Sequence, residues 1–319
     1  MIEVKNLVKD YGGHMAVDHL NFTVEDGQIY GFLGPNGAGK STTMNIITGY
    51  LGATEGEVWI DGHNILDEPE KAKKNIGYLP EVPPLYIEMT VDEYLNFAAE
   101  LKKIPAGTRR EATAEAKKLA GLNGVEKRLI RNLSKGYRQR VGLAQAVLGM
   151  PDVIILDEPT VGLDPKQIIE IRDVIRSLGK NHTVILSSHI LSEVSAVCDH
   201  ILIIPHGRLI ASDTPENLEK KMTGEKMLEL LVRGSAEAVG EVLDLAVPER
   251  EYHLEAEEDG CVRVSLEMAE DVRESLFFAF ADQRLPILAM NLQRASLEEV
   301  FLELTGEQGK EEERNEGDL

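Results

Sequence analysis

The first third of the chain alternates short apolar runs with pairs of turn residues. The apolar runs lie around Val4 and over residues 17–24, 29–33 and 58–60, and they are rich in β-branched side chains, which favour strands. Gly-Gly and Asp-Gly pairs separate them at 12–13, 26–27 and 61–62, as in tight turns. The pattern predicts an antiparallel sheet that leads into a further strand over residues 29–33.

From residue 90 to residue 122 the apolar period changes from strand to helix. Val91, Tyr94, Leu95 and Ala98 recur at i, i+3, i+4 and i+7, and a stretch rich in Ala, Lys and Glu follows at 109–120. This period places apolar side chains on one face of a helix. We therefore expect a helical subdomain over about residues 85–145.

Three later runs are apolar without interruption, at 153–156, 183–187 and 201–204. Each is joined to a segment with helical character, as expected of parallel strands that are buried on both faces. The predicted core domain, residues 1–215, is therefore an α/β fold.

Residues 226–305 follow a different order of elements. Apolar alternation and helical periods predict strand, helix, two strands, helix and strand at 227–232, 236–246, 252–257, 261–267, 272–284 and 287–293. This βαββαβ order is typical of the ferredoxin-like α+β arrangement. A short helix is expected to follow at 297–304.

The charge is distributed unevenly along the chain. Residues 1–215 carry 23 basic and 28 acidic side chains, whereas residues 216–319 carry 11 and 27, which makes the second segment far more acidic. We therefore predict a boundary near Pro215, an accessory domain over 216–305 and a disordered acidic tail over 306–319. The total charge of −21 also argues against broad nucleic-acid binding.

Membrane spans and secretion are not predicted. No run of 18 or more uninterrupted apolar residues occurs, and the N-terminus lacks a basic-then-apolar signal pattern. The two cysteines, Cys198 and Cys261, are far apart in sequence and belong to no metal-binding motif, so reduced thiols of a cytosolic protein are expected.

A glycine-rich loop follows the predicted strand at 29–33 and precedes a helix that begins near Lys40. Such a loop directs backbone N–H groups at a phosphate, and the helix N-terminus adds partial positive charge. Lys40 is expected to reach the β- and γ-phosphates, and the Ser41 hydroxyl to ligate Mg²⁺. The expected phosphate-binding residues are Gly34, Pro35, Asn36, Gly37, Ala38, Gly39, Lys40, Ser41 and Thr42.

Two adjacent carboxylates follow the apolar run at 153–156. Asp157 is expected to hold Mg²⁺, directly or through water, and Glu158 to accept the proton of the attacking water. By itself an apolar run followed by Asp-Glu is equally compatible with a solvated turn. When the same pattern follows a phosphate-binding loop in the sequence, it strongly indicates nucleotide hydrolysis.

The motif LSKGY offers a second anion-binding surface. Ser134 supplies a hydroxyl and Gly136 a backbone N–H at the start of a predicted helix over 137–148. Taken alone, this motif is better explained by an ordinary serine N-cap.

These motifs together resemble the ABC-type ATPases. LSKGYRQR is similar to the signature motif of that family, and IILDEPTVGLDP to its second nucleotide motif and the following loop, in a resemblance that covers about residues 2–213. It implies that Ser134 and Gly136 act on ATP held by a second subunit, that Asp164 lies in an inter-subunit loop with Gly162 and Leu163, and that His189 contacts the γ-phosphate.

Two further assignments rest on the resemblance. Tyr11 matches the aromatic residue that stacks on adenine, although a turn tyrosine is an alternative. Glu81 stands where most members carry a glutamine that links Mg²⁺ to the membrane partner. A carboxylate there can still bind Mg²⁺, but its hydrogen bonding differs from that of an amide.

The resemblance implies an ATP-hydrolysing subunit with ATP and Mg²⁺ as cofactors. Its partners would be a second ATPase subunit, as a homodimer, and a separate integral membrane permease of the bacterial exporter type, on the cytoplasmic face of the membrane. Two alternatives stay open: a mechanochemical ATPase acting on nucleic acid, and an ATP-binding module with little turnover. The C-terminal domain is interpreted as a regulatory module or as a spacer that strengthens dimer contacts.

Overall fold

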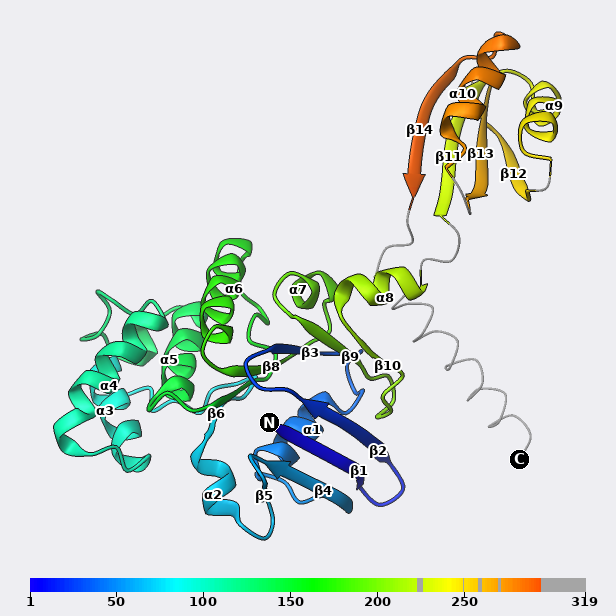
Figure 1. Ribbon diagram of the computed structural model, residues 1–319. Coiled ribbons are helices and arrows are strands. Elements are labelled where there is room, and N and C mark those ends of the chain that lie inside the picture. Colours follow the sequence, from blue (N-terminus) through cyan, green and yellow to red (C-terminus); the bar gives the residue numbers. More distant parts are fainter. Residues whose placement is uncertain (223–225, 249, 258–259, 269–270, 294–319) are drawn as a thin grey trace. The chain divides into compact units, whose positions relative to one another are not determined.

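The computed structural model describes residues 1–222, 226–248, 250–257, 260–268 and 271–293. Its contacts divide the chain into two compact units, residues 1–215 and 216–319, which are described separately below. Figure 1 shows the helices and strands of both units. The helix expected at 297–304 and the tail at 306–319 lie outside the described residues.

The first unit contains the predicted antiparallel sheet. Its strand order is β2-β1-β4-β5, and β1 pairs with both β2 and β4 in antiparallel register. The bounds are β1 Ile2–Asp10, β2 Met15–Val24, β4 Glu55–Ile60 and β5 His63–Asn64. Alternate side chains of β2 are buried, as expected of a sheet with one covered face.

A second, mostly parallel sheet of six strands forms the centre of this unit. Its order is β10-β9-β3-β8-β7-β6, and only the edge strand β10 runs antiparallel to its neighbour. The bounds are β3 Ile29–Leu33, β6 Ile76–Leu79, β7 Val153–Leu156, β8 Thr183–Ser188, β9 His200–Ile203 and β10 Ala211–Asp213. The predicted α/β fold is confirmed, while β6 and β10 were not anticipated.

The core of the first unit joins the two sheets through helix α1, Lys40–Ile47. Buried side chains of β1, β2 and β4 form one cluster with those of the parallel strands and with Met44, Ile46 and Ile47 of α1. Phe22 and Phe32 meet edge to face across this core, with ring centroids 5.2 Å apart. The packing fixes α1, and with it the preceding loop, against the sheets.

The helical stretch predicted from residue 90 to residue 122 contains two helices, α3 and α4. Thr90 and Glu93 form a capping box at the start of α3, and Pro105 precedes α4, because proline disfavours a helical residue before it. Both helices contact α5. The helices and the single 3₁₀ turn of the first unit are α2 Pro69–Lys74, α3 Val91–Leu101, α4 Ala106–Leu119, η1 Ile130–Asn132, α5 Lys135–Val147, α6 Pro165–Gly179 and α7 Leu191–Ser195.

The second unit has the predicted βαββαβ order. Its elements are α8 Pro215–Met222, which begins at the boundary, β11 Lys226–Arg233, α9 Ala236–Ala246, β12 Tyr252–Glu257, β13 Cys261–Met268, α10 Arg273–Asp282 and β14 Ile287–Gln293. The antiparallel order β12-β13-β11-β14 is ferredoxin-like and confirms the predicted arrangement. Alternate residues of β11 and β13 pack with α9 and α10 in a core of their own.

Among the residues that the structure describes, no helix is both long and apolar enough to cross a bilayer.

Candidate functional site

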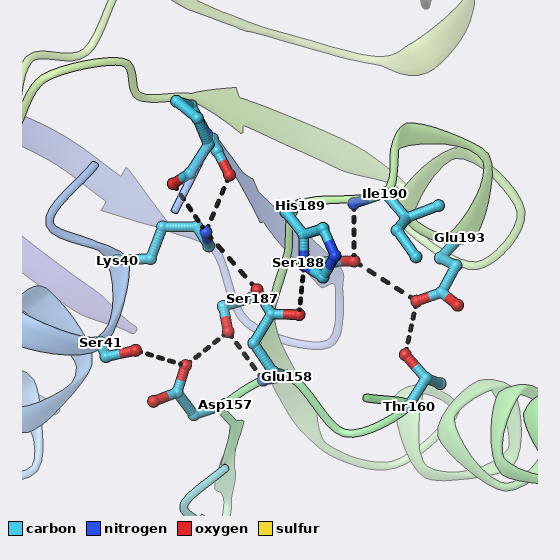
Figure 2. Close-up of polar contacts among 12 residues, drawn as sticks. Lys40, Ser41, Asp157, Glu158, Thr160, Ser187, Ser188, His189, Ile190 and Glu193 are labelled. Atoms are coloured by element: carbon cyan, nitrogen blue, oxygen red, sulfur yellow. Dashed lines mark hydrogen bonds and ion pairs between the residues drawn. The ribbon is translucent and has the colours of Figure 1, made fainter. Parts of the chain in front are cut away.

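Three neighbouring parallel strands deliver the candidate site residues to one edge of the central sheet. The phosphate-binding loop follows β3, His189 follows β8, and Asp157 and Glu158 follow β7. Since β8 lies between β3 and β7, their carboxyl ends converge at the same edge. Figure 2 shows the side chains from all three strand ends facing one another.

The phosphate-binding loop has a backbone that only glycine accommodates at Gly39. This residue has φ of 86°, and a Cβ there would lie 2.1 Å from the carbonyl oxygen of Ala16. Helix α1 begins at the next residue, Lys40. The Lys40 ammonium donates to the carbonyls of Gly34 (2.8 Å) and Pro35 (3.1 Å), so it lies within the loop that is expected to hold phosphates.

Ser41 and Asp157 lie together beneath this loop. The Ser41 hydroxyl donates to Oδ1 of Asp157 at 3.1 Å, and the carboxylate is only 2% exposed. A hydroxyl and a carboxylate are both oxygen ligands of the kind that Mg²⁺ prefers, so the predicted metal residues fit the ion. Ser187, which sequence analysis did not assign, donates to the same carboxylate oxygen at 2.6 Å.

Glu158 is held in a strained backbone conformation. Its φ is +46°, uncommon for a residue with a side chain, and its N–H donates to Ser187 Oγ at 2.8 Å. The buried carboxylate lies 3.4 Å from the Lys40 ammonium and 3.0 Å from Nδ1 of His189. Strain of this kind persists where surrounding contacts impose it, often at functional sites. Here it directs the carboxylate toward the phosphate-binding loop.

A cavity of about 480 Å³ opens beside these groups. The side chains and backbone that line it are those of Tyr11, His14, Ala16, Asn36, Gly37, Ala38, Gly39, Lys40, Ser41, Thr42, Glu81, Glu158, Val161 and His189. The structure therefore brings together most residues that were predicted separately. His14, Ala16 and Val161 were not predicted as site residues. His14 and Ala16 belong to no quoted motif, and Val161 lies in the IILDEPTVGLDP stretch without an assigned role.

Tyr11 and Glu81 lie at the rim of this cavity. Tyr11 is 54% exposed, and the Lys9 ammonium lies 5.2 Å from the centroid of its ring. Glu81 is exposed and lines the same cavity from the loop after β6.

The two signature residues and the predicted residue of the inter-subunit loop lie elsewhere on the first unit. Ser134, Gly136 and Asp164 are described, and none of them lines the cavity. Ser134 and Asp164 are the N-caps of α5 and α6, each accepting a backbone N–H through its side chain. A Cβ on Gly136 would lie 2.4 Å from Oε1 of Gln167 in α6, so the two helix starts are packed together.

One titratable group shows how α1 is fixed to the sheet. Burial raises the pKa of Tyr78 in β6, and the negative charge of Asp157 raises that pKa further. The protonated phenol donates to Oδ1 of Asn45 in α1 at 3.0 Å. This bond ties the helix behind the phosphate-binding loop to the edge strand of the central sheet.

Known proteins resemble this chain in sequence and in fold. A model of the ABC transporter family matches residues 17–161. The bacitracin transport ATP-binding protein BcrA of Bacillus licheniformis is 36% identical over 96% of this chain and 97% of its own length. The chain belongs to the ABC transporter family. The linearmycin resistance ATP-binding protein LnrL of Bacillus subtilis (strain 168) is 33% identical over 96% of this chain and 98% of that protein.

Solved structures agree with the sequence relatives of this ABC transporter subunit. The ATP-binding subunit of an ABC transporter superposes with a TM-score of 0.63, at 31% identity over 69% of this chain and 92% of its own. The dimeric ATP-binding cassette MJ0796, in a post-hydrolysis state with ADP and Pi, has a TM-score of 0.62 at 28% identity over 67% of this chain and 98% of its own. The ABC transporter subunit described here therefore binds and hydrolyses ATP, and it energises a separate membrane permease.

Proposed function

We propose that this subunit binds MgATP in the cavity beside α1 and hydrolyses it with Glu158 as the general base. The contact of the Glu158 carboxylate with both Lys40 and His189 carries this assignment. It supports the proposal because a proton acceptor, a cation for the phosphates and a polar sensor would then be in direct contact.

The lysine and the glutamate form an ion pair inside the site. Lys40 donates to the carbonyls of its own loop and lies 3.4 Å from Glu158. When a triphosphate enters the loop, its negative oxygens compete for the ammonium. Glu158 then loses a partner on one side and becomes available to orient a water molecule and accept its proton, while Nδ1 of His189 continues to fix the carboxylate.

Ser41 and Asp157 would hold the magnesium ion, with Glu81 contributing from the rim. A bound Mg²⁺ would neutralise part of the negative charge of the phosphates. The Ser187 hydroxyl donates to Asp157 and accepts the N–H of Glu158, and these two buried bonds keep the Asp157 carboxylate and the Glu158 backbone in fixed relative positions. Each carboxylate can then serve a different role.

A second copy of this chain would complete the site. Ser134, Gly136 and Asp164 lie outside the cavity of their own subunit, at two helix N-termini where anions are favoured. The solved relative MJ0796 is a dimeric cassette. We therefore propose that these residues close over the ATP of a partner subunit, as a homodimer.

An aromatic surface next to the Glu81 loop fits the membrane permease. Tyr86 follows that loop, is exposed, and has its ring centroid 5.4 Å from that of Phe97 and 6.2 Å from that of Tyr94 in α3. A hollow of about 170 Å³ lies between these rings and Lys102. Exposed apolar patches mark interaction sites. Docking there would place the subunit on the cytoplasmic face of the membrane.

Export is the direction of transport that the relatives support. Two of them are named for bacitracin transport and for linearmycin resistance. We propose that the permease partner of this chain likewise removes a toxic compound. Residues 216–305 would form an accessory domain, separate from the chemistry.

The decisive test is Glu158→Gln in the purified chain. The amide keeps the shape of the side chain but cannot accept the proton, so ATP hydrolysis should fall by about 100-fold or more. ATP should still bind, and an ATP-bound dimer should accumulate in size-exclusion chromatography. Lys40→Ala is the matched control, because it should weaken ATP binding itself.

Unchanged phosphate release by Glu158→Gln would remove Glu158 as the base. Negligible turnover by the wild-type chain with its permease would instead favour an ATP-binding module. Recovery of the chain with nucleic acid, and not with an integral membrane protein, would favour a mechanochemical ATPase.

A further inference from the structure

A buried carboxylate lies behind the site, in a helix to which no role has been assigned. Glu193 belongs to α7, which contacts β3 and β8. It is only 6% exposed. A buried carboxylate is costly unless polar groups compensate it, so its partners indicate what it does.

Both hydrogen-bond partners of Glu193 are hydroxyl groups next to site residues. Thr160 Oγ1 donates to Glu193 Oε2 at 2.5 Å, and Ser188 Oγ lies 3.3 Å from the same oxygen. The Ser188 hydroxyl in turn accepts the N–H of Ile190 at 3.0 Å. Figure 2 shows this network beside the one that joins Lys40, Glu158 and His189.

The two hydroxyls belong to the two turns that carry the chemistry. Thr160 is two residues after Glu158, and Ser188 immediately precedes His189. The turn around Thr160 is closed by backbone bonds from Val161 N to Glu158 O (3.2 Å) and from Leu163 N to Thr160 O (3.2 Å). Glu193 therefore connects the turn of the base, and the loop that leads to Asp164, to the turn of His189.

The charge of the Glu193 carboxylate sets the direction of both hydrogen bonds. An ionised carboxylate only accepts hydrogen bonds, so both hydroxyls must donate toward Glu193. Ser188 Oγ is then oriented to accept from Ile190 N, which fixes the backbone on the far side of His189. Hydrogen bonds to a charged acceptor are stronger than neutral ones, and the two turns are held at a defined separation.

We propose that Glu193 is a positioning residue for hydrolysis: it holds the Glu158 turn and the His189 turn in register, and ties both to the loop that ends at Asp164. This inference rests on the proposed roles of Glu158 and His189. Glu193 touches neither the nucleotide cavity nor the reacting groups, so it acts through the two hydroxyls.

The test is Glu193→Gln, which keeps the size of the side chain and removes its charge. We expect kcat for ATP hydrolysis to fall by about 10- to 100-fold, because small displacements of catalytic groups are costly. ATP affinity, measured with a fluorescent nucleotide, should change by less than about twofold. The melting temperature should stay within a few degrees of the wild type, so that the loss is confined to kcat.

Substitutions of Thr160 test the hydrogen bond between Thr160 and Glu193 independently. Thr160→Val removes the hydroxyl and should lower kcat as Glu193→Gln does, whereas Thr160→Ser keeps the hydroxyl and should retain activity. The double variant of Glu193→Gln and Thr160→Val should be no worse than either single one, as expected of groups that act together.

Ser195→Ala is the matched control, in the same helix. The Ser195 hydroxyl is buried and makes no hydrogen bond within the described part of the chain, so its removal should leave kcat unchanged.

A wild-type kcat in Glu193→Gln, or equal losses of ATP affinity, stability and kcat, would overturn the positioning role. If that variant does not fold, Thr160→Val against Thr160→Ser decides, because equal activities of the two would also overturn it. Failure of the proposed function would be seen separately, as an undiminished rate of ATP hydrolysis in Glu158→Gln.

Discussion

Charged side chains are buried in the first unit where each one meets an opposite charge or a set of donors. Lys40, Asp157 and Glu158 are all less than a tenth exposed. Lys40 has two carbonyls and a carboxylate, and Asp157 has two hydroxyls. These contacts offset the cost of removing the charges from water. They also leave each group in a position that ATP and Mg²⁺ can exploit.

Glu81→Gln tests the metal role at the rim of the cavity. Removing one exposed negative charge should weaken the apparent Mg²⁺ affinity of ATP hydrolysis by about two- to fivefold, since exposed charges interact weakly. Nucleotide binding without Mg²⁺ should not weaken. The measurement is ATPase activity across a Mg²⁺ titration.

Glu88→Gln is the control for that titration, because Glu88 is an exposed carboxylate that pairs with Arg131 and does not line the cavity. Equal Mg²⁺ dependence in the wild type and Glu81→Gln would contradict a metal role for Glu81.

At the scale of elements, three helix starts carry predicted site residues of this subunit. Helix α1 begins at Lys40, α5 at Lys135 behind its Ser134 cap, and α6 at Pro165 behind its Asp164 cap. Each start exposes backbone N–H groups and partial positive charge. The first lies in the cavity and the other two lie away from it, which is the arrangement that two facing copies would require.

Gly136→Ala tests the signature surface. The added methyl group would meet the end of the Gln167 side chain, which is flexible and can move, so the fold should survive. We expect ATP binding to the isolated chain to be retained and ATP hydrolysis to fall about tenfold or more, because packing at the start of α5 is disturbed where a partner's ATP should bind. Phosphate release and nucleotide binding are the two measurements.

Gly107→Ala in α4 is the matched control for Gly136→Ala. A Cβ at Gly107 would meet open space, and alanine is favoured over glycine in a helix by about 0.5–1 kcal/mol. Normal hydrolysis by Gly136→Ala would exclude a catalytic role for this surface.

His200 in strand β9 is expected to make the stability of the protein depend on pH. Burial lowers the pKa of His200 below its usual value, although the charge of Asp213 opposes the shift. Between the lowered and the usual pKa the unfolded chain binds more protons, so the free energy of unfolding should decrease as the pH falls below about 6.5. Urea unfolding of the wild type and His200→Gln at pH 7.5 and 5.5 measures it.

In that experiment His200→Gln should lose less stability than the wild type on acidification. The glutamine cannot gain a proton, and it can still reach Ser212, which lies 2.9 Å from Nε2 of His200. Equal losses in the two proteins would show that other groups account for the acid sensitivity.

At the scale of the whole molecule, each unit has its own hydrophobic core. The core of residues 1–215 joins two sheets and α1, and the core of the second unit joins one sheet to α9 and α10. A core of this kind allows a unit to fold on its own contacts. Damage to the second core should therefore leave nucleotide binding in the first unit intact.

Phe280→Ala tests that independence. Phe280 is fully buried in the second core, and truncating such a residue costs about 3–5 kcal/mol. The second unit should unfold at lower denaturant concentration, while MgATP affinity stays unchanged. Phe277→Ala, at a residue that is 55% exposed, should cost far less, about 0.5 kcal/mol. A parallel loss of MgATP binding in Phe280→Ala would contradict separate cores.

Much of the architecture followed from local patterns. The six elements from β11 to β14 match their predicted order and lie within a few residues of the predicted bounds, because each combines a clear period with clear turn residues. The strand β6 was missed because its four residues, IGYL, are too few to establish a period in the sequence and one of them is glycine. Pro105 lies between the two helical stretches that the pattern indicated, the apolar period that begins at Val91 and the Ala-, Lys- and Glu-rich stretch at 109–120.

The sequence by itself predicted the chemistry of the site, because a glycine-rich loop and the adjacent carboxylates that follow a later strand form a recognisable combination, and the family resemblance added His189. Only the tertiary structure decided which residues hold these groups in place. Ser187, Thr160 and Glu193 are ordinary polar residues along the chain, and they become partners because β7, β8 and α7 bring them within hydrogen-bonding distance. Hydrogen bonds between distant segments leave no periodic trace in a sequence, since each partner satisfies the local rules of its own element.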